Sequence, residues 1–194
     1  MEKKMKKLIE IHRDKGLNLT GRTLERESAK AIIWRGGKLL LVNSSIRDGY
    51  KFPGGGVKPG ESYEETLTRE ILEECGARLL HLLGEFGIVI ESKLPFEPEY
   101  EVFKMTSRYY LCQVGDGLGE QCLDDYEQEL GYRPQWVDIE YAIQTNRWLS
   151  SQTEANVPGW LVRETFILEL VRQQVISSGF FTPDAPAPPV SDPP

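Results

Sequence analysis

The chain has 194 residues, and its 40% hydrophobic content is enough for one compact domain with tails and argues against a second full domain. The formal net charge of -7 and the pI near 5.0 argue against a protein that coats a nucleic-acid backbone, because such binding needs clustered lysine and arginine. The three cysteines have no metal-ligand spacing, so they indicate neither a disulfide framework nor a zinc site and favour a reducing compartment.

The N-terminal segment shows no targeting signal. Its basic run ends at Lys7, and Glu10 interrupts the apolar residues that follow before a signal-peptide core develops. No window of the sequence approaches the length of a membrane span. We therefore expect a cytoplasmic protein without a membrane partner.

The first third of the chain combines a helical pattern with a hairpin pattern. Lys3 to Lys15 places apolar residues at helical spacing, which predicts a short amphipathic helix in an N-terminal extension over residues 1–28. The apolar runs Ala29–Trp34 and Lys38–Val42 flank an Arg-Gly-Gly tripeptide, which predicts a β-hairpin. The main domain is expected over residues 29–176.

A glycine-rich loop and a well-bounded helix follow the hairpin. Glycine and proline dominate residues 54–60, and this composition excludes regular structure. Ser62 and Glu65 have the spacing of a capping box, and Gly76 is a natural C-terminal stop. These signals predict a helix from Tyr63 to Cys75.

The second half of the chain alternates strands and helices. Leu79–Ile90 and Val102–Val114 are rich in β-branched and aromatic residues and predict two long strands. The remaining predicted elements are a short strand at Trp136–Val137, a helix from Asp138 to Asn146, a C-terminal helix over Gly159–Ile176, and a disordered proline-rich tail over residues 177–194.

Three carboxylates share one face of the Tyr63–Cys75 helix. Successive helical residues turn by about 100°, so Glu70, Glu73 and Glu74 fall within one arc. Like charges this close oppose their simultaneous ionisation, so a cation is expected beside them, and oxygen ligands suit Mg²⁺ or Mn²⁺. An exposed acidic helix behind a flexible loop is the alternative that the residues alone leave open.

The segment from Gly55 to Ala77 resembles the complete Nudix box, G-x5-E-x7-R-E-U-x-E-E-x-G-U, in which U is an aliphatic residue. Every fixed letter matches, and Phe52-Pro53-Gly54 resembles the usual lead-in. The resemblance covers about residues 29–146. It implies an α/β fold of the α+β type, a Nudix-like α/β/α sandwich in which helices flank a mixed β-sheet.

The family resemblance also implies an activity. The expected enzyme is a metal-dependent hydrolase that cleaves a phosphoanhydride bond in a nucleoside diphosphate linked to another moiety, by water attack on phosphorus. Glu70, Glu73 and Glu74 would bind Mg²⁺ or Mn²⁺ directly or through water, the Gly54 carbonyl would be a further ligand, and Glu70 resembles the position often assigned as the base.

The resemblance gives supporting roles to other residues. Arg69 and Glu61 would orient the acidic helix and the loop through an ion pair or hydrogen bonds. Several relatives take a further carboxylate from a downstream loop, and Glu127 is the candidate in the acidic segment here. This chain has Asn43-Ser44-Ser45 where many relatives carry a phosphate-binding arginine near the end of the second strand. The substrate-contact candidates are Arg47, Lys51, Tyr50 and Phe52.

Three other functions remain open at this point. A nucleotide sensor with the same fold and an isoprenoid diphosphate isomerase are both disfavoured by the complete set of box carboxylates. Removal of diphosphate from RNA 5′ ends stays within the hydrolase class, although the acidic balance opposes a long RNA footprint. We expect a small nucleotide-type substrate, no stable nucleic-acid partner, and the option of a homodimer through exposed strand edges. The box does not specify the leaving group.

Overall fold

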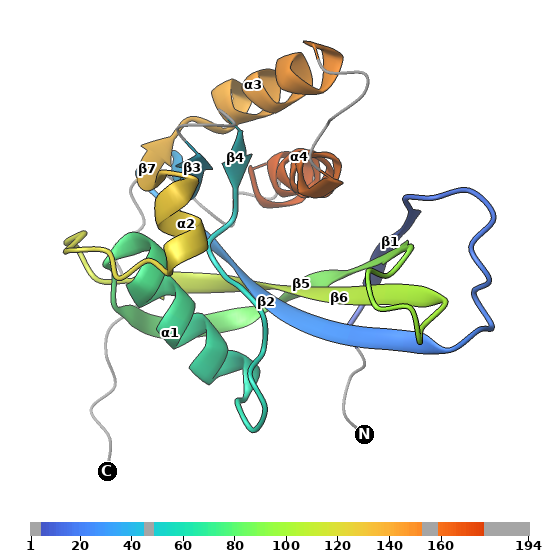
Figure 1. Cartoon of the computed structure of the whole chain (residues 1–194). Helices are drawn as coiled ribbons and strands as arrows, with labels where there is room; N and C mark the ends of the chain where they lie inside the picture. Colours follow the sequence, from blue (N-terminus) through green and yellow to red (C-terminus); the bar gives the residue numbers. More distant parts are fainter. Residues whose placement is uncertain (1–4, 45–48, 153–158, 177–194) are drawn as a thin grey trace.

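A mixed seven-stranded β-sheet runs through the molecule (Figure 1). The computed structural model describes residues 5–44, 49–152 and 159–176. The strands in these residues are β1 (Lys7–His12), β2 (Thr23–Arg35), β3 (Lys38–Ser44), β4 (Tyr50–Lys51), β5 (Leu79–Lys93), β6 (Val102–Val114) and β7 (Tyr132–Val137). Their order is β1-β5-β6-β2-β3-β4, and β7 pairs with β3. The β1–β5 and β2–β6 pairs are parallel, and the other pairs are antiparallel.

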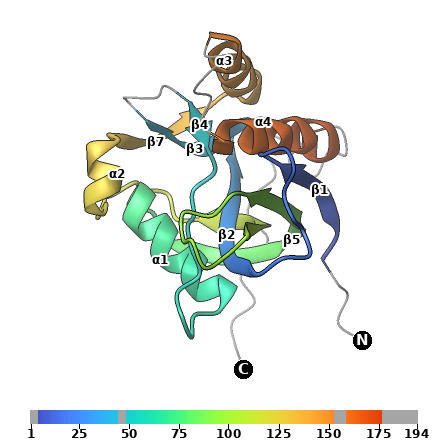
Figure 2. The same ribbon diagram turned by 45° about the vertical axis from the view of Figure 1, so that its right-hand side comes forward.

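Helices cover both faces of the sheet, as Figures 1 and 2 show from two directions. They are α1 (Tyr63–Cys75), α2 (Asp125–Glu129), α3 (Ile139–Gln152) and α4 (Gly159–Val171), which continues into a π-helical turn over Arg172–Ile176. One core cluster joins α1 to the sheet and the other joins α3 and α4 to it. The expected mixed sheet flanked by helices is therefore confirmed.

Strand β2 divides the two cores because successive side chains of a strand point to opposite faces. Ala29, Ala31 and Ile33 pack in the cluster with α1, whereas Ile32 packs in the cluster with α3 and α4. All four are buried. This strand therefore contributes side chains to both hydrophobic cores.

Most predicted elements agree with the structure. The hairpin is confirmed by the pairs Trp34↔Leu39 and Arg35↔Lys38, although β2 begins before the predicted run. Helix α1 and strand β6 have the predicted bounds. Asp138 caps α3, because its Oδ1 accepts hydrogen bonds from the N–H groups of Glu140 and Tyr141. The short helix α2 was not predicted.

The predicted N-terminal helix is wrong, because this segment contains the strand β1. Ile9 and Ile11 are two residues apart with Glu10 between them, so this short stretch also fits the two-residue period of a strand. Both residues pack against the cluster that contains Val89, and β1 pairs in register with β5 through Ile9↔Val89. Pairing with an available sheet edge outweighs the local helical preference.

Some predictions concern residues outside this description. The predicted tail over residues 177–194 and the substrate-contact candidate Arg47 both lie outside the described residues. Among the helices of the described ranges, none is both long and apolar enough to cross a membrane.

The N-terminus of α1 is closed by the capping box that the sequence predicts. Ser62 Oγ accepts a hydrogen bond from the Glu65 N–H at 3.2 Å, and the Glu65 carboxylate accepts one from the Ser62 N–H at 2.8 Å. Gly76, at φ 59°, ends the helix in the left-handed conformation. Both ends of the helix are therefore fixed locally.

We expect Ser62→Ala to lower the free energy of unfolding by about 1 kcal/mol, because it leaves the Glu65 N–H without its capping oxygen. Urea unfolding followed by circular dichroism measures this. Thr68→Ala is the matched control, since it removes an exposed hydroxyl from the same helix without removing a cap. Equal stability of Ser62→Ala and wild type would show that the cap contributes nothing.

Candidate active site

The loop before α1 lies against the edge of β2 that faces away from β6. The Ala31 N–H donates to the Pro53 carbonyl at 2.8 Å, and the Ala29 N–H donates to the Gly55 carbonyl at 3.1 Å. Gly54 has a φ of 129°, and a Cβ at this position would lie 2.1 Å from the Ala29 carbonyl oxygen. Only glycine fits such a close approach of two backbones. The loop is therefore held at a fixed distance from the sheet.

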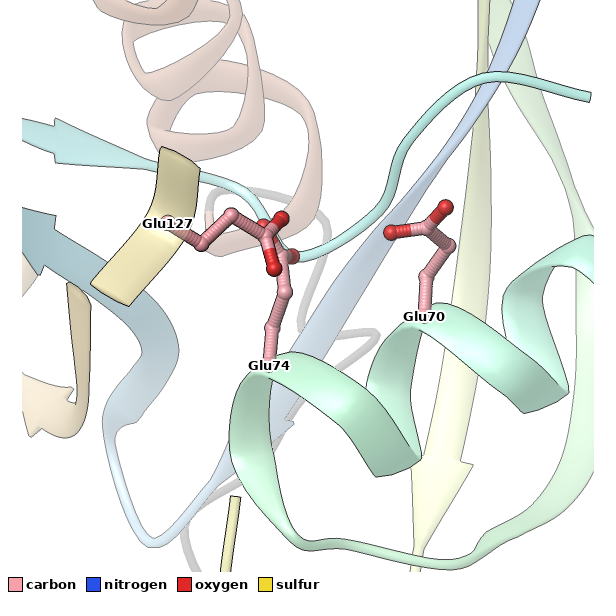
Figure 3. A group of neighbouring side chains, drawn as sticks. All are labelled: Glu70, Glu74 and Glu127. Atoms are coloured by element: carbon pink, nitrogen blue, oxygen red, sulfur yellow. The ribbon is translucent and has the colours of Figure 1, made fainter. Parts of the chain in front are cut away.

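Three carboxylates meet beside this loop. Glu70 and Glu74 lie one turn apart on α1, and Glu127 reaches them from α2 (Figure 3). Their closest ligand oxygens lie within 4.8 Å of one another. Glu70 and Glu74 are 7% and 1% exposed, whereas Glu127 is half-buried. The structure thus brings the downstream candidate Glu127 to the two box carboxylates.

Glu74 is held from two sides. Its Oε2 accepts a hydrogen bond from the Gly54 N–H at 2.6 Å, and its Oε1 accepts one from Lys51 Nζ at 2.7 Å. The Lys51 ammonium also lies 3.8 Å from the centroid of the Tyr132 ring. Burial alone would lower the pKa of Lys51, but the Glu74 carboxylate raises it above its usual value. This ion pair keeps the Lys51 ammonium charged.

The other two carboxylates carry negative charge that is less well compensated. Burial raises the pKa of Glu70, although its neighbour Arg69 opposes the shift. Burial, with the Glu74 charge second, raises the pKa of Glu127 to about 7. Both shifts report charged forms that lack enough positive partners. Three clustered carboxylate groups of this kind fit a hard divalent cation such as Mg²⁺ or Mn²⁺.

Arg69 connects the loop to helix α1. The expected ion pair between Arg69 and Glu61 is present. Its Nε and Nη2 donate to the two Glu61 carboxylate oxygens at 2.7 and 2.9 Å. Its Nη1 donates to Glu70 at 2.5 Å and to Glu73 at 3.1 Å, and its Nη2 donates to the Gly56 carbonyl at 3.1 Å. Glu73 is thus turned toward the guanidinium and is not a member of the three-carboxylate group.

Lys30 is a residue of the site that the sequence analysis missed. It is 7% exposed, and its ammonium donates to the Gly54 carbonyl, the group expected to be a metal ligand. Burial lowers its pKa, and the nearby Glu74 and Glu164 carboxylates oppose that shift. A lysine inside the apolar run Ala29–Trp34 was the available signal, because a buried ammonium needs a specific partner.

Two of the expected substrate contacts are buried. Phe52 has no exposed surface and meets Tyr109 edge to face, so the expectation that it contacts substrate is corrected: it is a core residue. Tyr50 is 6% exposed, its ring meets Tyr141, and its backbone is paired with the Asn146 side chain. Both aromatic residues pack into the core because β4 is covered by α3 and α4.

The comparison with protein families agrees with the predicted resemblance. The NUDIX domain model matches residues 24–156, which is more than half of the chain. The chain belongs to the Nudix family.

Individual relatives match shorter stretches. An RNA pyrophosphohydrolase of Sulfurovum sp. (strain NBC37-1) is 35% identical over 74 residues, covering 37% of this chain and 47% of that protein. "Putative 8-oxo-dGTP diphosphatase YtkD" of Bacillus subtilis (strain 168) is 46% identical over 61 residues, covering 30% and 38%. The chain therefore matches less than half the length of these curated relatives. A solved NUDIX hydrolase from Nitrosomonas europaea gives a TM-score of 0.49 at 21% identity, covering 73% of this chain and 88% of that one.

The raised pKa of Glu127 gives the metal-free protein a pH-dependent stability. The folded pKa is about 7 and the reference value is 4.5, so the native state holds the proton more tightly than the unfolded state between these pH values. Stability should therefore fall as the pH rises from about 4.5 to about 7. Because Gln cannot ionise, we expect Glu127→Gln to make this fall shallower.

Urea midpoints measured across this pH range in the presence of chelator test the prediction. Glu129→Gln removes an exposed carboxylate from the same helix and should keep the wild-type slope. A Glu127→Gln profile that coincides with wild type would contradict the assigned shift.

Proposed function

We propose that this protein is a metal-dependent pyrophosphohydrolase that cleaves a phosphoanhydride bond in a nucleoside diphosphate linked to another moiety. The observation that carries the proposal is the meeting of Glu70, Glu74 and Glu127 within 4.8 Å beside the glycine-rich loop. A buried acidic group of this density needs a cation, and membership of the Nudix family gives that cation a role in hydrolysis.

The carboxylates of the chain would form the metal-binding site. Glu70, Glu74 and Glu127 would hold Mg²⁺ or Mn²⁺, and Glu73, which lies on the outer side against Arg69, would act through water. When bound, the metal would neutralise the diphosphate and lower the pKa of the attacking water. Glu70 is our candidate for the proton acceptor, because it matches the position often assigned as the base.

Cations of the chain complete the site in this proposal. The Arg69–Glu61 ion pair would keep the loop and the carboxylates of α1 in register. Lys51, at the edge of the acidic group, is our candidate for contact with a substrate phosphate, since its ammonium is held within reach by Glu74. Arg47 keeps the same proposed role. The Gly54 carbonyl keeps its proposed role as a metal ligand, shared with the Lys30 ammonium.

The relatives suggest two substrate classes to compare. One relative is named for action on RNA ends and another for action on an oxidised nucleotide, 8-oxo-dGTP. We propose a small nucleoside phosphate as the substrate, because the net charge of -7 disfavours a long RNA footprint. The other parts of the proposal are a cytoplasmic location and the option of a homodimer.

We expect Glu74→Gln to fold normally and to lower metal-dependent turnover by at least about 100-fold, because even outer partners of metal ligands contribute about 10 to 100-fold. The assay follows phosphate or nucleotide release with Mg²⁺, with Mn²⁺ and with chelator. Glu64→Gln is the control, since it removes an exposed carboxylate from the same helix. Wild-type turnover by Glu74→Gln would refute the site.

A panel of candidate substrates tests which class of compound the enzyme cleaves. It contains 8-oxo-dGTP, a nucleotide sugar, ADP-ribose, a dinucleoside polyphosphate and a short RNA with a 5′ triphosphate. We expect the highest kcat/KM for one of the small nucleotides. Preference for the RNA would replace our substrate proposal with RNA end processing, and binding without turnover of any compound would favour a nucleotide sensor.

A further inference from the structure

The segment Phe52-Pro53-Gly54 is held on its outer edge by two buried carboxylates from different helices. The Phe52 N–H donates to Glu164 Oε2 at 2.9 Å, and the Gly54 N–H donates to Glu74 Oε2 at 2.6 Å. Pro53, between them, has no N–H to satisfy. On the inner edge, the Pro53 carbonyl accepts a hydrogen bond from the Ala31 N–H of β2. The segment is therefore fixed like a sheet strand whose outer partner is replaced by two side chains.

Glu164, on α4, is itself rigidly held. It is completely buried, and its Oε1 accepts hydrogen bonds from the Tyr109 hydroxyl at 3.0 Å and from Arg163 Nε at 2.9 Å. Arg163 extends to Glu91 on β5, and Arg13 reaches Glu91 from the N-terminal side. Burial would raise the pKa of Glu164, but Arg163 and Lys30 lower it overall. The carboxylate therefore stays charged inside the core.

A charge in this position is costly for a helix that could dock by apolar contact alone. Ile167, Leu168 and Val171 of the same helix are fully buried in the core cluster with the sheet. These apolar side chains already attach α4 to the sheet, and a buried ion pair is weak evidence for added stability. An apolar residue could accept none of the three hydrogen bonds to Glu164, and of these only the one from the Phe52 N–H reaches the loop.

We propose that Glu164 is a positioning residue for the metal centre: by holding the Phe52 N–H, it fixes the Gly54 peptide that in turn fixes the Glu74 carboxylate. The inference rests on the proposed function, because it takes Glu74 to be a metal ligand. Glu164 does not touch the three-carboxylate group itself. It acts two residues away along an extended segment, from the opposite face of the sheet to α1.

Mn²⁺ affinity, measured by calorimetric titration of the full chain, tests this role. Glu164→Leu removes the acceptor for the Phe52 N–H, and we expect Mn²⁺ to bind at least about 10-fold more weakly, the loss typical of a displaced supporting contact. Glu164→Gln keeps an acceptor oxygen and should bind Mn²⁺ within about threefold of wild type. Wild-type affinity in Glu164→Leu, or an equal loss in Glu164→Gln, overturns the proposal.

The matched control is Tyr109→Phe. This variant removes the hydroxyl that donates to the other oxygen of Glu164 and leaves the Phe52 contact in place. It disturbs the same buried carboxylate, so it should lower stability without the 10-fold loss of Mn²⁺ affinity. A loss as large as that of Glu164→Leu would assign the effect to general damage of the core and overturn the proposal.

A backbone substitution covers the case in which Glu164→Leu does not fold. Replacement of Phe52 by its α-hydroxy analogue turns the amide into an ester, which removes the N–H donor and keeps every side chain. We expect the same loss of Mn²⁺ affinity, of at least about 10-fold. Wild-type affinity in this ester variant contradicts the proposed connection.

Hydrogen exchange of the Gly54 amide in the metal-free protein separates this inference from the proposed function. We expect this amide to exchange at least about 10-fold faster in Glu164→Leu or in the ester variant, and at the wild-type rate in Glu164→Gln. Failure of the wild type to bind Mn²⁺ would refute the proposed metal centre, whereas unchanged Gly54 exchange would refute the positioning role.

Discussion

The hydrogen bond from the Gly54 N–H to the buried carboxylate of Glu74 joins the two parts of this site, the glycine-rich loop and the acidic helix. It forms only because Gly54 adopts a conformation that other residues rarely reach and lies too close to Ala29 for any side chain. The loop carbonyls, paired with β2, fix one side, and the carboxylate fixes the other. This contact therefore ties the loop directly to the helix that carries the site carboxylates.

Electrostatic repulsion is the second constraint on the fold around the site. Two cations lie against these carboxylates: Lys51 pairs with Glu74, and Arg69 bridges Glu61, Glu70 and Glu73. These cations come from the elements on either side of the loop, so they compensate the acidic helix while leaving Glu70 and Glu127 short of positive charge. The two cations offset part of the repulsion within the three-carboxylate group, and the remaining negative charge favours binding of a further cation.

Local signals allowed the sequence to predict α1, its two caps, the hairpin and the family, because each depends on residues close together in the chain. The sequence did not predict contacts that depend on tertiary packing. Lys30 lies in an apolar run, and Glu164 lies between Arg163 and Thr165 on a largely apolar helix. Nothing local indicates that both side chains contact the Phe52–Gly54 segment. The strand β1 was assigned as a helix because only the edge of β5 decides between the two periodicities. Glu127 is the favoured candidate of an acidic segment in which no local signal separates the carboxylates, and α2 brings it to Glu70 and Glu74.

Glu91 gives the two ends of the described chain a shared anchor. Arg13, just after β1, and Arg163, on α4, both bind its carboxylate, which is 4% exposed. The family match covers residues 24–156, so a protein trimmed to that match would lack β1 with Arg13 and α4 with Arg163. It would also leave β5 with an uncovered edge. The residues matched by the family model are therefore fewer than the residues that pack together in the structure. Strand β1 completes the sheet on which α4 packs.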